Sequence, residues 1–555
     1  MPDGANKSVV SPSASANECL FLINADESTF LRLPFVKRHR EATTSPVDSF
    51  TVTVALPLSY EKSKAAKYPL LILSSGQHFI GSAIELTRGL ALSKEAGACI
   101  IVNHDDALLA EGDSGLQAAK IEKIIAWCRS RFRVKPGEVA ILLSQHNAAS
   151  ISALMDTSRA VVDRIVIADA NIESAKWVQQ VAVLREGRPS IAWSTRKLAL
   201  AMTSNGIAHH RLDEASDEGC VVPALIHGVR AFWSTGLLYG DEMMPLSRPW
   251  VSAVLSRAVP FISFLRKPFG ESSNKGGEPS RYVFQSKILG RNFEIFVSLP
   301  ASPPRSAAGY PAIVALDANS TWSTVMETAA RMADANEIED VVAIGIGVPR
   351  SEGDISFGLR RFEELSPPVD AAAWVNPLGR FFVSIFAMFG RNATKHFGLA
   401  PQFHQFLTQE LLPTLTPILP IDPSRLHLVG HSAAGTYVAY EAAQADTPFK
   451  FFGALSPGVA ISDSWMLKRD GGLAKSGNEL DMLVTIGGDE RSNAFNTLAG
   501  IPQSERYASE MKADALCNVE YLCLDGETHT SVFPRALALF LSRMFGHQTV
   551  KTDHA

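Results

Sequence analysis

The sequence predicts an α/β protein built from two tandem domains, each with a mostly parallel sheet flanked by helices. Three observations support this prediction. A chain of 555 residues is too long for one ordinary core. Short apolar runs alternate with helix-compatible stretches in both halves, which is the pattern of a parallel sheet covered by helices. Segments of the first half also recur in the same order in the second half, which indicates an internal duplication.

Six pairs of segments carry this repeat. The earliest pair alternates apolar and polar residues and ends in Leu-Pro, which is typical of an early antiparallel strand. The second pair is a short apolar run suited to a buried strand. The paired segments occur in the same order in both halves, which favours duplication over the general similarity of any two doubly wound domains. The pairs are FTVTVALP (50–57) with FEIFVSLP (293–300), YPLLIL (68–73) with YPAIVA (310–315), ACIIVNHDD (98–106) with DVVAIGIGV (340–348), ILLSQHNAAS (141–150) with LHLVGHSAAG (426–435), RIVIADA (164–170) with FFGALSP (451–457), and CVVPALIHGVRAFW (220–233) with SVFPRALALFLSRMF (531–545).

Composition sets the expected boundaries. We expect a polar, disordered tail over 1–17, a first domain over 18–245, a linker segment over 246–280 and a second domain over 281–548. The linker segment contains an apolar stretch over 250–269, which suits an amphipathic helix packed on a domain better than one on a membrane surface. The second half also carries an insertion within roughly 351–400.

Charge and cysteine usage exclude several classes of function. The net charge of -5 gives no reason to expect a nucleic-acid partner. The six cysteines are scattered without a CxxC motif, which favours reduced thiols over a disulfide framework or a zinc site. The N-terminus has no apolar core typical of a secretory signal, and no run is long enough to span a bilayer. We therefore expect a cytoplasmic protein without a membrane span.

The segment LHLVGHSAAG (426–435) has the form of a nucleophile elbow, in which a strand, a tight turn with a serine and a helix follow one another. Ser432 is the candidate nucleophile. Ala434 departs from the usual pattern, which has glycine there, but a small residue is kept. The alternative is that Ser432 only caps the helix that follows.

A serine hydroxyl needs a base to take its proton and a third group to orient that base. Two later segments supply these groups in the order serine, acid, histidine. LDMLVTIGGDE ends an apolar strand with Asp489 and Glu490; we favour Asp489 as the acid, with Glu490 close behind. EYLCLDGETHTSVFP places His529, the candidate base, on a loop after another strand; the alternative is a surface histidine.

The reaction of such a serine also needs two backbone amides aimed at the developing oxyanion. One should come from Ala433, directly after the nucleophile. The other should come from the loop after the strand AIVALD, at Ala318 or Asn319.

In the first half each of these elements is replaced. Asn147 stands at the serine position and Gln145 at the first glycine of the elbow. The segment over 189–200 offers no carboxylate, and Glu218 stands at the histidine position. We predict that the first domain is catalytically dead and serves packing, dimerisation or the shape of the active-site mouth.

The second half resembles the putative-esterase branch of α/β-hydrolases, the group that contains enterochelin esterase and other siderophore esterases, esterase D and the mycolyltransferases. The resemblance covers about 281–548 and implies a serine–histidine pair that hydrolyses esters, here Ser432 and His529. Enterochelin esterases carry a different N-terminal domain, whereas this chain has a degenerate copy. The matching pieces are AIVALDANSTW, ARMADANEIEDVVAIGIG, LRRFEELSP, FHQFLTQELLPTL, LHLVGHSAAG, FFGALSPG, IGGDE and GETHTSVFPRAL.

The insertion offers candidates for substrate binding. Arg360 and Arg361 suit an anionic or catecholate ligand, although an ion pair with Glu363 or Glu364 is an equal alternative. The aromatic stretch over 371–389 suits an apolar lid or an acyl pocket, or ordinary packing. Trp322 and His431 are further candidates for contact with the substrate.

These observations together predict a serine esterase that works through an acyl-enzyme on a small-molecule ester, with a siderophore-type lactone or another natural-product ester as the leading substrate class. No metal or organic cofactor is implied. Two alternatives stay open, an acyltransferase with the same serine and histidine and a non-catalytic scaffold. A homodimer through the N-terminal domain is compatible with the sequence.

Overall fold

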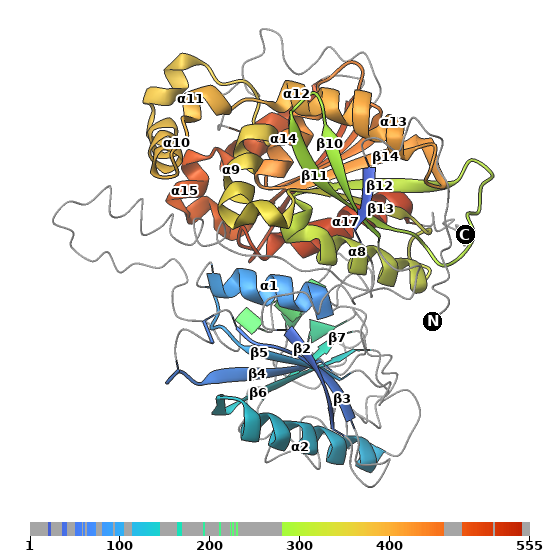
Figure 1. Cartoon of the computed structure of the whole chain (residues 1–555), viewed down its shortest axis with the longest axis vertical. Coiled ribbons are helices and arrows are strands. Elements are labelled where there is room, and N and C mark those ends of the chain that lie inside the picture. The colour runs from blue at the N-terminus through green and yellow to red at the C-terminus, as the bar shows by residue number, and fades with distance from the viewer. Residues whose placement is uncertain are drawn as a thin grey trace, which may run out of the picture.

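The computed structural model contains two sheets, one in each half of the chain, with helices around both (Figure 1). It describes residues 20–23, 36–41, 50–57, 59–60, 64–73, 80–92, 95–104, 114–144, 164–168, 193–194, 210–211, 222–223, 225–226, 229–230, 280–459, 480–513 and 517–546. The tail over 1–17 and the linker segment over 246–279 therefore lie outside the described residues. The predicted α/β fold class is confirmed.

The larger sheet has nine strands in the order β1-β10-β11-β13-β12-β14-β15-β16-β17. The first three pairings are antiparallel and the other five are parallel, so the sheet is mostly parallel as predicted. The strands are β1 (Leu20–Ile23), β10 (Ser280–Ser286), β11 (Arg291–Ser298), β12 (Tyr310–Leu316), β13 (Val342–Gly347), β14 (Ile421–His431), β15 (Phe449–Leu455), β16 (Leu480–Gly487) and β17 (Cys517–Leu524).

The smaller sheet has six strands in the order β2-β3-β5-β4-β6-β7. Helices α1 (Ile80–Leu92) and α2 (Ser114–Arg131) lie on opposite faces of it (Figure 1). The strands are β2 (Val36–Glu41), β3 (Phe50–Ala55), β4 (Tyr68–Leu73), β5 (Ile100–His104), β6 (Val134–Ser144) and β7 (Arg164–Ala168); β8 (Trp193–Ser194) and β9 (His210–Arg211) form a separate parallel pair.

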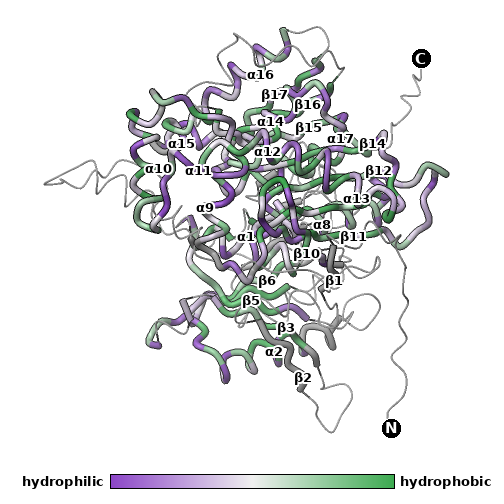
Figure 2. Tube along the Cα trace, turned by 45° about the horizontal axis from the view of Figure 1, so that its top comes forward, coloured by the Kyte–Doolittle hydropathy of each residue, from purple (hydrophilic) through white to green (hydrophobic). Residues whose placement is uncertain are grey.

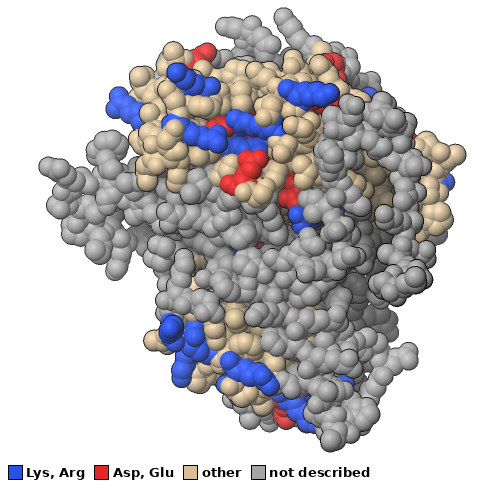
Figure 3. Space-filling view, in the orientation of Figure 1, with Lys and Arg blue, Asp and Glu red and all other residues tan. Residues whose placement is uncertain are grey.

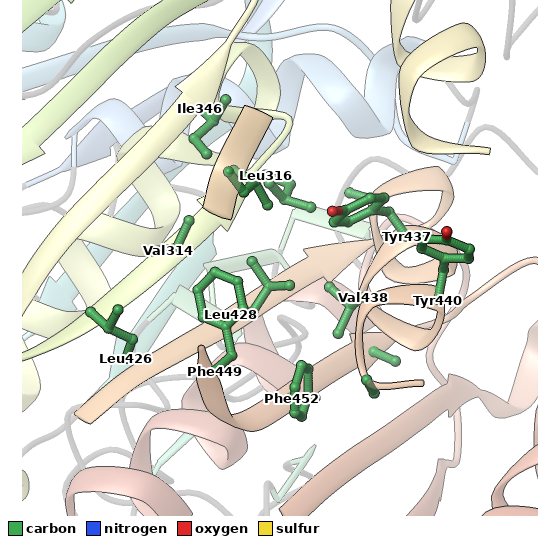
Figure 4. Close-up of a cluster of buried hydrophobic side chains, with 14 of the residues drawn as sticks. Val314, Leu316, Ile346, Leu426, Leu428, Tyr437, Val438, Tyr440, Phe449 and Phe452 are labelled. Carbon is green, nitrogen blue, oxygen red and sulfur yellow. The ribbon is translucent and has the colours of Figure 1, made fainter. Parts of the chain in front are cut away.

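Both faces of the larger sheet are buried, which is why its central strands are almost continuously apolar. Along β12, Val314 and Leu316 face one core, whereas Ile313 and Ala315 face the other, as the period of two in a strand requires. Figure 4 shows part of the core that contains Val314 and Leu316. Figure 2 shows apolar residues running along strands such as β5 and β6.

Two sets of helices cover these faces. Helices α8 (Ala318–Asp334) and α17 (Val532–Phe545) pack on one face. On the other face lie α12 (Ala400–Gln405), a π-helical turn over Phe406–Leu411, α13 (Leu412–Leu415), α14 (Ala433–Glu441) and α16 (Ser504–Lys512). On the side of the molecule seen in Figure 3, basic and acidic side chains are interspersed over the described surface of the larger half.

The insertion of the second half forms helices between β13 and β14. Helix α10 begins at a well-formed N-cap, because the Asn376 side chain accepts a hydrogen bond of 2.8 Å from Gly379 N and proline occupies the first helical position. The elements are η2 (Arg350–Glu352), α9 (Gly353–Leu365), η3 (Ala371–Val375), α10 (Pro377–Met388) and α11 (Ala393–His396). After β16 follow η5 (Gly488–Ser492), α15 (Ala494–Leu498) and η6 (Ile501–Gln503).

Strand β1 differs from the predicted boundaries. Leu20–Ile23 was assigned to the first domain, but it pairs antiparallel with β10 and extends the larger sheet. This pairing covers the N–H and C=O groups that β10 would otherwise leave open at the sheet edge. The start of the chain therefore contributes to the second half. Among the described residues, no helix has the length and apolar character needed to cross a bilayer.

Candidate active site

Ser432 lies in the turn between β14 and α14 with a φ of 61° and a ψ of -120°. A non-glycine residue rarely adopts a positive φ, so the turn must be held by its surroundings. Ser432 N donates a hydrogen bond of 2.9 Å to Leu455 O on the neighbouring strand β15, and Thr436 N donates one of 2.9 Å to Ser432 O. This strained turn presents the serine at the carboxyl end of β14.

Glycines on both sides make the turn sterically feasible. A Cβ atom at Gly430 would lie 2.6 Å from the backbone of Ala434, and one at Gly435 would lie 2.8 Å from Leu455 O. The Ala434 side chain is fully buried in this contact. The departure at Ala434 is therefore accommodated, because the close approaches at this elbow fall on the two glycines.

His529 lies between the serine and a carboxylate. Its Nε2 atom is 2.9 Å from Ser432 Oγ, and its Nδ1 atom is 2.5 Å from Glu490 Oε2. Of the two carboxylates that the sequence left open, the structure brings Glu490 to the histidine. Asp489, the favoured residue, has a half-exposed side chain whose carboxylate lies 4.0 Å from Arg230 instead. The preference for Asp489 is corrected, because neighbouring residues of this turn point in different directions.

Glu490 is buried, and both of its carboxylate oxygens make hydrogen bonds. Its Oε1 atom accepts hydrogen bonds from Ser456 Oγ at 2.7 Å and from Gly487 N at 2.8 Å, which leaves Oε2 for His529. These bonds fix the carboxylate and hence the orientation of the histidine ring. The sequence analysis missed Ser456; its position directly after β15, the strand beside the elbow, was the available signal.

The turn with the acid and the loop with the histidine touch through their backbones. Asp489 N donates a hydrogen bond of 3.0 Å to Glu527 O. A Cβ atom at Gly487 would lie 2.3 Å from the same Glu527 O, so the contact requires glycine there. The IGGDE segment thus allows Glu490 to reach His529.

His431, predicted as a substrate contact, lies beside the catalytic candidates. Its ring centroid is 4.7 Å from that of His529 and 5.3 Å from that of Phe533. Burial, with a further contribution from the nearby His529, holds the pKa of His431 well below its usual value. His431 is therefore neutral near pH 7 and does not compete with His529 for a proton.

The predicted oxyanion amides lie at two helix starts. Ala433 is the first residue of α14 and Ala318 is the first residue of α8. Amides in the first turn of a helix have no acceptor within that helix and lie at its positive end. The Asn319 side chain is occupied, because it donates to Val348 O and accepts from Val348 N, both at 2.7 Å.

Arg361 is paired with Asp317 at the start of α8. Its side chain is buried and its Nε atom donates a hydrogen bond of 2.9 Å to Asp317 Oδ2. Asp317, directly before Ala318, adopts a left-handed conformation with a φ of 56°. This ion pair supports a role of Arg361 in holding the turn before Ala318, and its substrate role stays a prediction.

Arg360 is likewise buried in ion pairs. Its guanidinium lies 2.7 Å from Glu364 and 2.7 Å from Glu352, and it packs over the ring of Phe293. The predicted alternative, an ion pair with Glu363 or Glu364, describes Arg360, whereas Arg361 is paired with Asp317. Trp322 is also corrected: its side chain is 1% exposed and packs in the core against Phe296 and Gly345.

The aromatic stretch of the insertion packs onto the elbow. Phe381, Phe382 and Phe386 are buried in one cluster that also includes Ala433. Phe389 is partly buried at its margin. The packing interpretation therefore holds for these rings, whereas Met388 on the same helix is 67% exposed. Asn147, Gln145, Glu218 and the segment over 195–200 lie outside the described residues.

A serine between a parallel strand and a helix, with a histidine and a carboxylate in reach, defines the α/β-hydrolase class. Residues 383–518 match the model of the putative esterase family. The chain is 26% identical over 274 residues to the ferri-bacillibactin esterase BesA of Bacillus subtilis (strain 168), which covers 48% of this chain and 89% of that protein. These matches support a carboxylic ester hydrolase in the C-terminal half of the chain.

Solved structures that match part of this chain include the BES protein from Bacillus cereus, with 22% identity and a TM-score of 0.41, covering 50% of this chain and 99% of that one. The siderophore hydrolase EstB from Aspergillus nidulans has 16% identity and a TM-score of 0.39, with coverage of 50% and 99%.

Proposed function

We propose that this protein hydrolyses esters through an acyl-enzyme formed on Ser432, with His529 as the general base and Glu490 as the acid that orients it. The observation that carries this proposal is the chain of contacts from Ser432 Oγ through His529 to Glu490, at 2.9 and 2.5 Å. A base in hydrogen-bond reach of the nucleophile and an acid on its other nitrogen are the requirements of this chemistry.

In the first step His529 Nε2 takes the proton of Ser432 as the oxygen attacks the ester carbonyl. The oxyanion is stabilised by the amide of Ala433 and by that of Ala318 or Asn319, at the positive ends of α14 and α8. The intermediate collapses, and His529 returns the proton to the departing alcohol. Water then attacks the acyl-enzyme and loses its proton to His529, which passes it to Ser432 Oγ as the bond between that oxygen and the acyl carbon breaks and the carboxylic acid leaves.

The substrate class that we propose is a siderophore-type ester or lactone. Support comes from the curated relative, whose name states that it is a ferri-bacillibactin esterase. The two arginines give no support, because Arg360 and Arg361 are paired inside the protein. The proposal therefore rests on the family and not on an anion site.

Product analysis in H2(18)O tests this function. A triscatecholate trilactone, its iron complex and an aryl ester are each incubated with wild type and with Ser432→Ala, with and without an added alcohol. We expect the linear acid with one heavy oxygen in the new carboxyl group, formed by wild type alone. If the added alcohol were acylated in preference to water, the protein would be an acyltransferase. If no substrate were turned over, the proposed substrate class would be wrong.

We also propose that the N-terminal half is a degenerate duplicate of the esterase half. The order β2-β3-β5-β4-β6-β7 matches the order β10-β11-β13-β12-β14-β15. The pairings agree residue by residue: Leu70 with Ile100 corresponds to Ala312 with Val342, and both β6 and β14 change register after their first pair.

This correspondence leaves the first half without a nucleophile. The strand register aligns Ser144 with His431, so Gln145 follows at the place of Ser432. The similarity of the segments themselves pairs Asn147 with Ser432. Neither amide side chain can act as an alkoxide, so both alignments support a catalytically dead first half. If the first half is catalytically dead, a fluorophosphonate should label only Ser432, which the intact mass of the treated protein measures.

A further inference from the structure

Helices α1 and α8 lie side by side between the two sheets (Figure 1). Glu327 on α8 accepts hydrogen bonds from Gly81 N at 3.1 Å and Ser82 N at 2.7 Å. Glu85 on α1 accepts from Ser323 N and Thr324 N, both at 3.1 Å. The two helices therefore exchange the same contact in both directions, as an interface with two-fold symmetry does.

The symmetry relates residues that the proposed duplication makes equivalent. Glu85 follows Tyr68, the first residue of β4, at the same distance along the chain at which Glu327 follows Tyr310, the first residue of β12. Ser82 and Thr324 are related in the same way, and both donate their hydroxyl groups to the opposite glutamate. The α1–α8 contact is thus a pseudo-symmetric core of the interface between the halves.

Contacts of a second kind connect the first half with the loop that carries His529. Thr528 Oγ1 donates a hydrogen bond of 2.6 Å to Glu95 Oε2. Arg230 Nη1 donates to Gly526 O and to Ser531 Oγ, both at 3.0 Å. Glu95 and Thr528 are buried. The loop is therefore held from the first half at both sides of the histidine.

Glu95 and Arg230 also hold each other, because Arg230 Nε lies 3.5 Å from Glu95 Oε2. Arg230 Nη2 lies 4.0 Å from Asp489, the neighbour of Glu490. One ion pair of the first half thus reaches the turn with the acid and the loop with the base. A loop is the least rigid support for a catalytic side chain, so such contacts have direct consequences for its placement.

We propose that Glu95 and Arg230 are positioning residues for His529, and that the catalytically dead half has the function of fixing the catalytic loop of the other half. This inference rests on the proposed roles of Ser432 and His529. Without Glu95, the Thr528 hydroxyl keeps only its longer contact of 3.2 Å with Ser531 Oγ, and the backbone that carries His529 loses its link to the first half at this point. Since His529 must lie about 3 Å from Ser432 Oγ to take its proton, a small shift lowers the rate of the acylation step.

The test uses the full-length chain with Glu95→Ala, Arg230→Met, Thr528→Val and Thr528→Ser. Thr528→Val keeps the shape of the side chain and removes the hydroxyl, whereas Thr528→Ser keeps the hydroxyl. Glu85→Gln is the matched control, because it perturbs the same interface at a distance from the loop contacts. The measurements are kcat and KM for an aryl acetate, the second-order rate of labelling by a fluorophosphonate, and the thermal midpoint of each variant.

We expect kcat and the labelling rate to fall together by roughly 10- to 100-fold in Glu95→Ala, Arg230→Met and Thr528→Val, as for a displaced catalytic group, with KM changed less than about threefold. Thr528→Ser should restore most of the rate. The double variant Glu95→Ala/Thr528→Val should lose less than the product of the two single losses, because both substitutions remove the shared contact between Glu95 and Thr528.

The proposal is overturned if the folded variants keep the wild-type kcat, or if Glu85→Gln lowers kcat as much as Glu95→Ala does. A fall of the thermal midpoint without a fall of kcat would assign these residues to stability alone. The proposed function is tested separately, since wild type must be labelled at Ser432 before the variants are compared. Loss of labelling in wild type would refute the site, whereas normal labelling in all variants would refute only the positioning role.

Discussion

His529 Nδ1 lies 2.5 Å from Glu490 Oε2, while the carboxylate of the adjacent Asp489 lies beside Arg230. Glu490→Gln should therefore lower kcat by about 10³- to 10⁴-fold, because an amide does not hold the histidine in the orientation and tautomer that the reaction needs. Asp489→Asn, the matched control, should change kcat only a few-fold. Steady-state kinetics with an aryl ester checks both. A larger loss in Asp489→Asn than in Glu490→Gln would reverse the assignment.

We expect Arg361 to stabilise the folded protein and to hold the turn before Ala318 in place. Arg361→Met leaves the carboxylate of Asp317 buried without its partner, which should lower the free energy of unfolding by about 3 kcal/mol or more and also lower kcat. Arg360→Met should destabilise the protein less, because Glu364 loses one ion pair but keeps the one with Arg291. Urea denaturation together with kinetics measures both effects. An unchanged unfolding free energy with a raised KM for anionic esters would show instead that the arginines bind substrate.

The elbow should tolerate a change at Ala434 but not at Gly430. Gly430→Ala places a methyl group 2.6 Å from the backbone of Ala434, so we expect a loss of about 2 kcal/mol of stability and of most activity. Ala434→Gly restores the usual glycine of the motif and should keep activity within a few-fold. Thermal unfolding and kinetics of the two variants check this. Wild-type behaviour of Gly430→Ala would contradict the described turn.

Stability should depend on pH through Glu85. Burial, opposed by hydrogen bonds from Ser323 and Thr324, raises the pKa of Glu85 to about 7 from its ordinary value of 4.5. Glu85 loses its proton at a lower pH in the unfolded chain than in the folded protein. The free energy of unfolding that the protonated side chain contributes is therefore fully present below about pH 4.5 and is lost as the pH rises to about 7, a difference of roughly 3 kcal/mol.

Thermal midpoints of wild type and Glu85→Gln between pH 4.5 and 8 measure this pH-dependent contribution of Glu85 to stability. Since glutamine does not titrate, the wild type should lose more stability than the variant as the pH rises. Parallel curves for the two proteins would show that Glu85 ionises alike in the folded and unfolded chain.

The parts of this protein that the sequence predicts are those with local patterns. The elbow around Ser432 is a strand, a turn and a helix in one segment, and the loop with His529 follows a strand, so both could be located. The choice between Asp489 and Glu490 could not be made, because it depends on the direction of each side chain in a short 3-10 turn. The ion pairs of Arg360 and Arg361 similarly depend on which helix face meets Asp317.

Long-range features left no local signal. Leu20–Ile23 pairs with a strand far along the chain, and a short apolar strand does not indicate its partner. Glu95 lies in none of the segments singled out in the sequence and Arg230 lies in a repeat segment without a catalytic signal, so only the packing of the two halves brings them to Thr528 and Ser531. The sequence therefore indicates the proposed catalytic residues better than the residues that hold them in place.

The central claim is that Ser432 is activated by His529 and that the first half carries no such serine. Intact mass after treatment with a fluorophosphonate, on wild type and on Ser432→Ala, tests it most directly. We predict one adduct on wild type and none on the variant. An adduct that persists in Ser432→Ala, or its absence from the folded wild type, would contradict the account.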